Sequence, residues 1–112
     1  MKRKILFFRE YFLDFYLGLD AKDQEKIEYV LDMVKNLQWI PKKFLKHIEG
    51  TDGLFEIRVS SFNSDYRIFC FFDSGMLVIL LTGFQKKSQK TPKKEIEHAL
   101  NLMKEYLKEK IK

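Results

Sequence analysis

Three apolar runs in the middle of the chain constrain its fold most. Residues 54–60, 65–72 and 76–84 are rich in Phe, Ile, Val and Leu, which is typical of β-strands. The segments between them, 61–64 and 73–75, are short and have turn-forming sequences. Because parallel neighbours need a connection of about a dozen residues or more, these runs predict three consecutive antiparallel strands.

One further strand and two helices are predicted before these three strands. Residues 2–8 predict one further strand, and apolar residues at helical spacing predict a short helix over 9–19. Asp20 suits the N-cap of a second helix, which is expected to end before Pro41. The two helices predict a hairpin whose apolar stripe is buried against the sheet.

A final helix is predicted after the strands. Thr91 suits its N-cap and Pro92 its first helical position. The predicted order is therefore β-α-α-β-β-β-α. We expect a single α+β domain over residues 1–112, with the N-terminal helical hairpin packed on a small antiparallel sheet and a C-terminal helix.

The composition argues against several classes of protein. Cys70 is the single cysteine and lies in an apolar run, so we expect a buried thiol and no intramolecular disulfide. Two histidines and one cysteine that are far apart in the sequence predict no metal site, and we expect no cofactor. Charged residues interrupt the apolar N-terminus, which predicts neither a signal peptide nor a membrane span and favours the cytoplasm.

The net charge of +5 is unevenly distributed. Residues 1–84 carry twelve Lys/Arg and twelve Asp/Glu, whereas residues 85–112 carry nine Lys and four Glu. An acid-free run around the predicted helix start contains five lysines: Lys86, Lys87, Lys90, Lys93 and Lys94. Because free N–H groups at a helix start also attract phosphate, this run indicates a polyanionic partner. A solvated lysine run that only increases solubility is the alternative.

Two arginines are predicted to face each other in the sheet. If the loop 61–64 closes a regular hairpin, Ser60 pairs with Asp65, and Arg58 then lies opposite Arg67 on the same face. Like charges in that position destabilise a sheet by roughly 0.2–1 kcal/mol. One interpretation is an anion site, because guanidinium groups suit phosphate oxygens. The other is that Glu56 or Asp65 neutralises the pair.

The two histidines and the aromatic residues Trp39 and Tyr29 give weaker signals. His47, just before the first of the three central strands, is a candidate RNA-binding or acid–base residue, with a loop or surface role as the alternative. His98 is expected on the helix surface. Trp39 and Tyr29 are expected to pack against the protein rather than stack on bases.

Three motifs occur together in an order that is similar to a known family. They are Gly53-Leu54-Phe55-Glu56-Ile57-Arg58, then Tyr66-Arg67-Ile68, then Gly83-Phe84-Gln85-Lys86-Lys87 with Thr91-Pro92 and a helix containing Ala99. In combination they resemble the HigB-type toxins of the RelE/ParE superfamily. The resemblance extends from about residue 3 to about residue 108, which is nearly the whole chain.

The resemblance implies a RelE-like, microbial RNase-type fold with helices on one side of a small antiparallel sheet. It also implies a type II toxin, an endoribonuclease that cuts mRNA on the ribosome and is neutralised by a small helix-turn-helix antitoxin. On this resemblance Arg58, Arg67, Lys86 and Lys87 match the catalytic positions. The nearby Lys90, Lys93 and Lys94 are then expected to bind RNA, together with His47.

One catalytic residue of the toxins that this chain resembles has no counterpart here. The catalytic residues of those toxins often include a C-terminal Tyr or His, whereas Tyr106 lies on the apolar stripe of the last helix and is expected to be packed. The general acid is therefore unassigned. Two other functions stay open: a ParE-like gyrase inhibitor on the same fold, and a non-catalytic module that binds nucleic acid or a protein partner.

Overall fold

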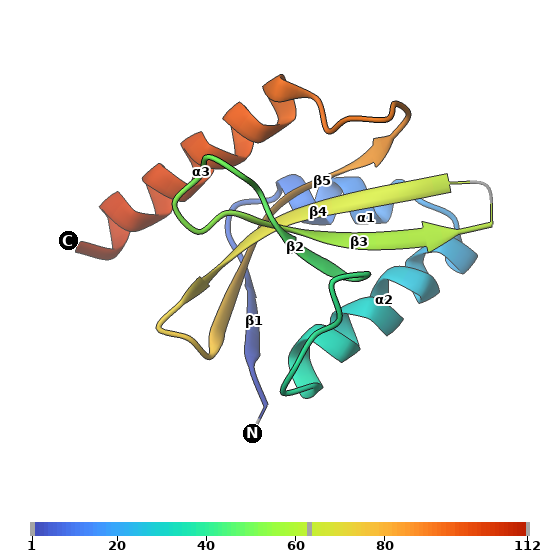
Figure 1. Ribbon diagram of the computed structural model, residues 1–112, viewed down its shortest axis with the longest axis horizontal. Coiled ribbons are helices and arrows are strands. Elements are labelled where there is room, and N and C mark those ends of the chain that lie inside the picture. The colour runs from blue at the N-terminus through green and yellow to red at the C-terminus, as the bar shows by residue number, and fades with distance from the viewer. Residues whose placement is uncertain (1, 63, 112) are drawn as a thin grey trace.

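Five strands and three helices make up the part of the chain that the computed structural model describes, residues 2–62 and 64–111 (Figure 1). In chain order they are β1 (Lys4–Phe7), α1 (Tyr11–Leu17), α2 (Ala21–Asn36), β2 (Leu45–His47), β3 (Phe55–Ser61), β4 (Ser64–Asp73), β5 (Leu77–Lys86) and α3 (Lys93–Ile111). The strands form one sheet in the order β1-β5-β4-β3-β2. The predicted α+β class is confirmed.

The central meander has the predicted register. Strands β3, β4 and β5 are consecutive antiparallel neighbours. Ser60 pairs with Asp65, and Arg58 lies opposite Arg67. The alternation of apolar residues holds this pairing, because a slip by one residue would turn the core side chains to the other face.

The edges of the sheet differ from the prediction. Strand β1 pairs in parallel with β5, so the sheet is mixed rather than entirely antiparallel. A parallel neighbour is possible because most of the chain separates the two strands. Strand β2 was not predicted: its three residues pair with β3 at the opposite edge, and so short a segment has no alternation that could reveal it.

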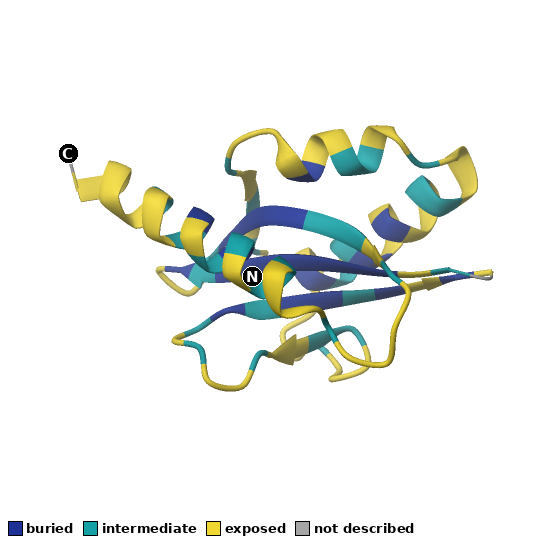
Figure 2. Ribbon diagram, turned by 90° about the horizontal axis from the view of Figure 1, so that it is seen from above, coloured by how far each residue is buried: buried dark blue, intermediate teal, exposed yellow. Residues whose placement is uncertain are grey.

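The helices cover both faces of the sheet. Helices α1 and α2 pack on one face through Phe12, Ile27, Val30 and Val34. Helix α3 packs on the other face through Ala99 and Leu102, which meet the alternate residues of β4 and β5. The expectation of helices on one side only is therefore wrong for α3. Figure 2 shows the buried residues concentrated in the strands and on the inner sides of the helices.

A β-bulge sets which way the end of β5 faces. Phe69 pairs with Thr82 and Cys70 with Leu80, so Leu81 is the extra residue of β5. This insertion shifts the alternation beyond it by one position, which turns Lys86 to the face that carries α3. Without the bulge, Lys86 would point toward the face covered by α1 and α2.

Two further expectations can be compared with the structure. Cys70 is fully buried, as predicted, and burial raises the pKa of its thiol. None of the described helices is long and apolar enough to cross a membrane.

Candidate anion-binding site on the sheet

The face that carries α3 has an apolar half and a charged half. Phe69 and Phe71 of β4 lie under α3, and Arg67, two residues before Phe69, points to the same face beyond the helix. Arg58 faces Arg67 from β3, and Lys86 faces Asp65 from β5. Glu56 completes a group that we call the arginine cluster: Glu56, Arg58, Arg67 and Lys86.

Glu56 lies at the centre of the arginine cluster. Its side chain is nearly inaccessible, with 2% of the residue exposed. The Oε1 atom lies 3.3 Å from Nε of Arg58 and 3.8 Å from Nε of Arg67. This carboxylate therefore offsets part of the repulsion between the two arginines, which supports the neutralisation interpretation for Glu56. Asp65 is exposed and accepts a hydrogen bond from Ser60.

One carboxylate does not satisfy both arginines. Neither Nε atom has a hydrogen bond of normal geometry to any described residue, although both atoms are buried. Arg67 is 8% exposed and donates from Nη1 to the carbonyl of Tyr66 at 3.0 Å. Its burial lowers its pKa. Buried cations with free N–H groups favour an incoming anion, because the anion would replace the missing partners.

Lys86 adds a third cation to the arginine cluster. The side chain is half-buried, and this burial lowers its pKa, with the charges of Arg67 and Arg58 lowering it further. Lys86, Lys87 and Asp65 line an open hollow of about 430 Å³. A lysine of lowered pKa in an accessible position has the properties of a general base.

The lysine run continues beside the arginine cluster: Lys87 and Lys90 lie in the loop after β5, and Lys93 and Lys94 lie in the first turn of α3. Lys87, Lys90, Lys93 and Lys94 are all exposed, and none pairs with a described carboxylate. The prediction for Thr91 is wrong in detail. Helix α3 begins at Lys93, and the Thr91 hydroxyl donates to Oε2 of Glu56 at 3.1 Å instead of capping the helix. This bond holds the lysine run against the sheet.

The two histidines lie outside the arginine cluster. His47 pairs with Phe55 in the β2–β3 ladder and packs edge-on against its ring on the face covered by α2, away from the arginine cluster. Its Nε2 lies 3.0 Å from the carbonyl oxygen of Thr51. His98 is half-buried on α3 and contacts the ring of Tyr11. The structure therefore does not bring His47 to the other candidate residues.

Two aromatic predictions have opposite outcomes. Tyr106 is packed as expected: its ring contacts Phe8 and Phe71, and its hydroxyl donates to Asp73 at 2.7 Å. Trp39 is 83% exposed and Tyr29 59%, so the expectation that both pack is wrong. Of the described candidates for the missing general acid, His47 contacts Phe55, His98 contacts Tyr11 and the Tyr106 hydroxyl donates to Asp73, so none of the three contacts the arginine cluster.

Comparison with known proteins supports the fold. Residues 14–104 match the family described as "Phage derived protein Gp49-like (DUF891)". A chain in the crystal structure of the archaeal RelE–RelB complex from Pyrococcus horikoshii OT3 superposes with a TM-score of 0.57 at 15% identity. The match covers 81% of this chain and 100% of that one, so the fold is RelE-like. No curated protein sequence matches the chain.

Proposed function

Because the chain belongs to the Gp49-like family of phage-derived proteins and has a RelE-like fold, we propose that it is the toxin of a type II toxin–antitoxin system. We place it with the HigB-type toxins and infer that it acts in the cytoplasm as an endoribonuclease on ribosome-bound mRNA. A small helix-turn-helix antitoxin is its proposed inhibitor. The observation that carries the proposal is the arginine cluster, in which Arg58, Arg67 and Lys86 surround a single buried carboxylate.

The proposed reaction is transesterification of RNA. The 2′-oxygen attacks the adjacent phosphorus, the bond to the 5′-oxygen breaks, and the products are a 2′,3′-cyclic phosphate and a 5′-hydroxyl end. Charge builds up on the phosphoryl oxygens during this step. Arg58 and Arg67 are suited to stabilise it, because they are held in place before substrate arrives and lie in a site partly shielded from water.

Lys86 is the proposed base. Its lowered pKa increases the fraction of neutral amine that accepts the 2′-hydroxyl proton. The proton for the 5′-oxygen comes from water in this scheme, since no side chain is assigned as general acid. Lys87, Lys90, Lys93 and Lys94 are proposed to hold the RNA backbone near the arginine cluster.

The test is induced expression in bacteria, with mapping of mRNA ends and pulse labelling of protein and DNA damage markers. We expect translation to stop, with new mRNA ends in translated regions and intact DNA. Continued translation with a DNA damage response would favour the gyrase inhibitor. Salt-sensitive RNA binding without cleavage, even on translating ribosomes, would favour the non-catalytic module.

A further inference from the structure

A second group of basic residues is hidden by the balanced charge of residues 1–84. Within that range, the two short segments 2–4 and 33–47 carry seven Lys/Arg and no Asp/Glu. The rest of the range carries five Lys/Arg and twelve Asp/Glu. The zero net charge of this range is therefore the sum of a strongly basic part and an acidic part.

Arg3 joins the two basic segments into one surface. Its backbone N–H donates to the carbonyl of Lys35 at 2.8 Å. Its guanidinium group donates to three carbonyls at the end of α2, those of Val34 (2.8 Å), Leu37 (2.6 Å) and Gln38 (3.1 Å). Figure 1 shows the start of β1 beside the end of α2. Arg3 is thus used for structure, and the neighbouring lysines are left on the outside.

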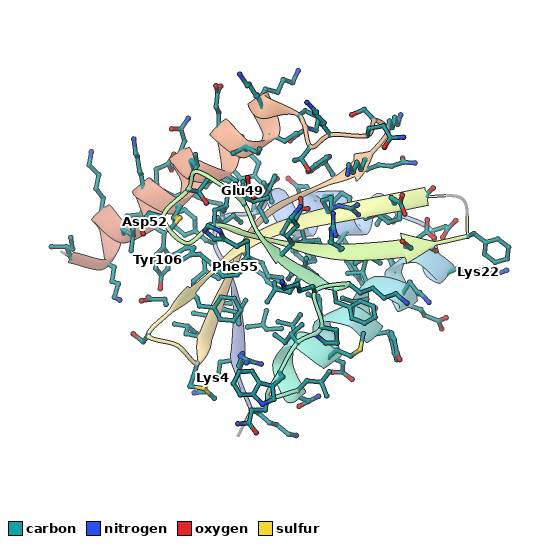
Figure 3. All side chains as sticks on the ribbon, in the orientation of Figure 1. Lys4, Lys22, Glu49, Asp52, Phe55 and Tyr106 are labelled. Atoms are coloured by element: carbon teal, nitrogen blue, oxygen red, sulfur yellow. The ribbon has the colours of Figure 1, made fainter. Side chains whose placement is uncertain are left out.

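These lysines have no anionic partner among the described residues. The five are exposed and form no ion pair: Lys2, Lys4, Lys35, Lys42 and Lys43. Lys2 and Lys4 line a shallow hollow of about 380 Å³. In the view of Figure 3, Lys4 lies at the lower end of the molecule, away from Glu49 and Asp52. We call these five lysines, together with Trp39, the basic end.

Trp39 distinguishes the basic end from a solubilising charge run. It is the single tryptophan of the chain and lies between Lys35 and Lys42 in the sequence. Its exposed fraction is 83%. A solubilising surface gains nothing from an exposed indole. Lysines around an exposed aromatic ring match the chemistry of single-stranded nucleic acid, in which phosphates alternate with bases that stack on aromatic side chains.

We propose that the basic end is a second RNA-binding surface, in which the lysines hold backbone phosphates and Trp39 stacks on an unpaired base. The two edges of the basic end lie at different distances from the arginine cluster. Lys4 is near the end of β4 at Asp73, six residues and roughly 20 Å from Arg67. Lys43 is closer, because the carbonyl of the next residue, Phe44, accepts the backbone N–H of Arg58 at 2.8 Å.

Tryptophan fluorescence tests this proposal directly, because Trp39 is the only source of the signal. The probe is an unstructured oligouridylate, titrated at several salt concentrations. We expect quenching that saturates and weakens as salt increases. No quenching by the oligouridylate would overturn the proposal. Quenching or a blue shift with vesicles of phosphatidylglycerol and phosphatidylcholine, but not with RNA, would overturn it in favour of a membrane surface.

Charge-matched variants locate the binding site. Lys42→Glu with Lys43→Glu is expected to abolish the quenching, whereas Lys104→Glu with Lys108→Glu, which changes the same number of exposed lysines on α3, is expected to preserve it. Equal loss in both double variants would contradict the proposal, because it would show binding that depends on net charge alone. Circular dichroism verifies that each variant is folded.

A second pair of variants tests stacking, with binding followed by the anisotropy of labelled RNA. Trp39→Ala is expected to weaken binding by about tenfold, and Trp39→Phe by much less, because phenylalanine still stacks. Equal affinity of Trp39→Ala and the unchanged protein would contradict the role of Trp39.

The fluorescence test of the basic end does not depend on whether the protein cleaves mRNA. Arg67→Ala is expected to retain the Trp39 quenching. Quenching without any ribosome-dependent cut would overturn only the proposed function. Cleavage without quenching would overturn only the second RNA-binding surface.

Discussion

Glu56 is the residue on which the arrangement of the arginine cluster depends. It contacts both arginines and accepts the Thr91 hydroxyl, so one carboxylate connects β3, β4 and the loop before α3. Its position two residues before Arg58 puts both side chains on one face of β3, and this spacing is readable from the sequence. The hydrogen bond from Thr91 could not be predicted from the sequence, because it joins residues 35 positions apart.

Glu56→Gln should destabilise the fold. The substitution leaves two arginines facing each other without a charge between them, and we expect a loss of roughly 2–3 kcal/mol, since Arg58 is partly solvated. Urea unfolding measures it, with the exposed Asp65→Asn as control. Adding Arg67→Ala to Glu56→Gln should recover part of the loss. No recovery in the double variant would show that repulsion between the arginines is not the cause.

Lys86 should control the pH dependence of cleavage. The folded protein binds the Lys86 proton less tightly than an ordinary lysine does, so the neutral base forms at lower pH. We expect the rate to rise with pH until the lowered pKa is passed and then to level off. Lys86→Arg removes this rise because arginine stays protonated, whereas Lys87→Arg preserves it. An unchanged profile in both variants would rule out a lysine base.

The bulge in β5 is the element that brings Lys86 into the arginine cluster. Gly83 follows this bulge and lies against the ring of Phe15 from α1. A Cβ built at Gly83 would lie 2.5 Å from Cδ2 of Phe15, which is closer than atoms in contact can be. The absence of a side chain therefore lets α1 pack directly on the strand that carries the candidate base.

Gly83→Ala should therefore destabilise the protein. We expect a loss of about 1–3 kcal/mol, because the methyl group forces the Phe15 ring and α1 outward. Gly18→Ala is the matched control: Gly18 has φ −81°, and a Cβ there meets only ordinary contacts. Thermal unfolding of both variants distinguishes them. Equal stability of Gly83→Ala and Gly18→Ala would show that the contact relaxes at no cost.

Elements with strong local patterns could be predicted, and elements that depend on distant contacts could not. The meander of β3, β4 and β5 and the Asp20 cap of α2, which accepts the N–H of Asp23, follow from alternation and from capping chemistry. Strand β2 exists because β3 offers a free edge. The side of the sheet that α3 covers likewise depends on the path of the chain after the bulge rather than on the apolar stripe of the helix.

At the scale of the whole molecule, the zero net charge of residues 1–84 concealed the basic end. A count along the sequence could locate the lysines of residues 86–94, because they lie within one short segment. The same count missed the basic end, since the acids elsewhere in residues 1–84 balance it and the fold brings its two segments together. The opposing arginines could be predicted because hairpin geometry is local.

The lysine run should determine how strongly salt weakens RNA binding. Each lysine that contacts a phosphate adds about 0.7 to the slope of log affinity against log salt. We therefore expect a shallower slope when Lys87, Lys90, Lys93 and Lys94 are changed to Gln. The same change at four exposed lysines on the helices, Lys22, Lys26, Lys104 and Lys108, should leave the slope nearly unchanged. Equal slopes in both quadruple variants would exclude a localised contact.

The central claim is that the arginine cluster cleaves RNA, and single-turnover cleavage of mRNA on programmed ribosomes tests it most directly. We predict cuts by the unchanged protein and by Lys104→Ala, and a rate lower by about 10²–10³-fold in Arg67→Ala and in the less buried Arg58→Ala. Folding of each variant is verified by its melting curve. Cleavage by both arginine variants at the full rate, or no cleavage by the unchanged protein, would contradict the claim.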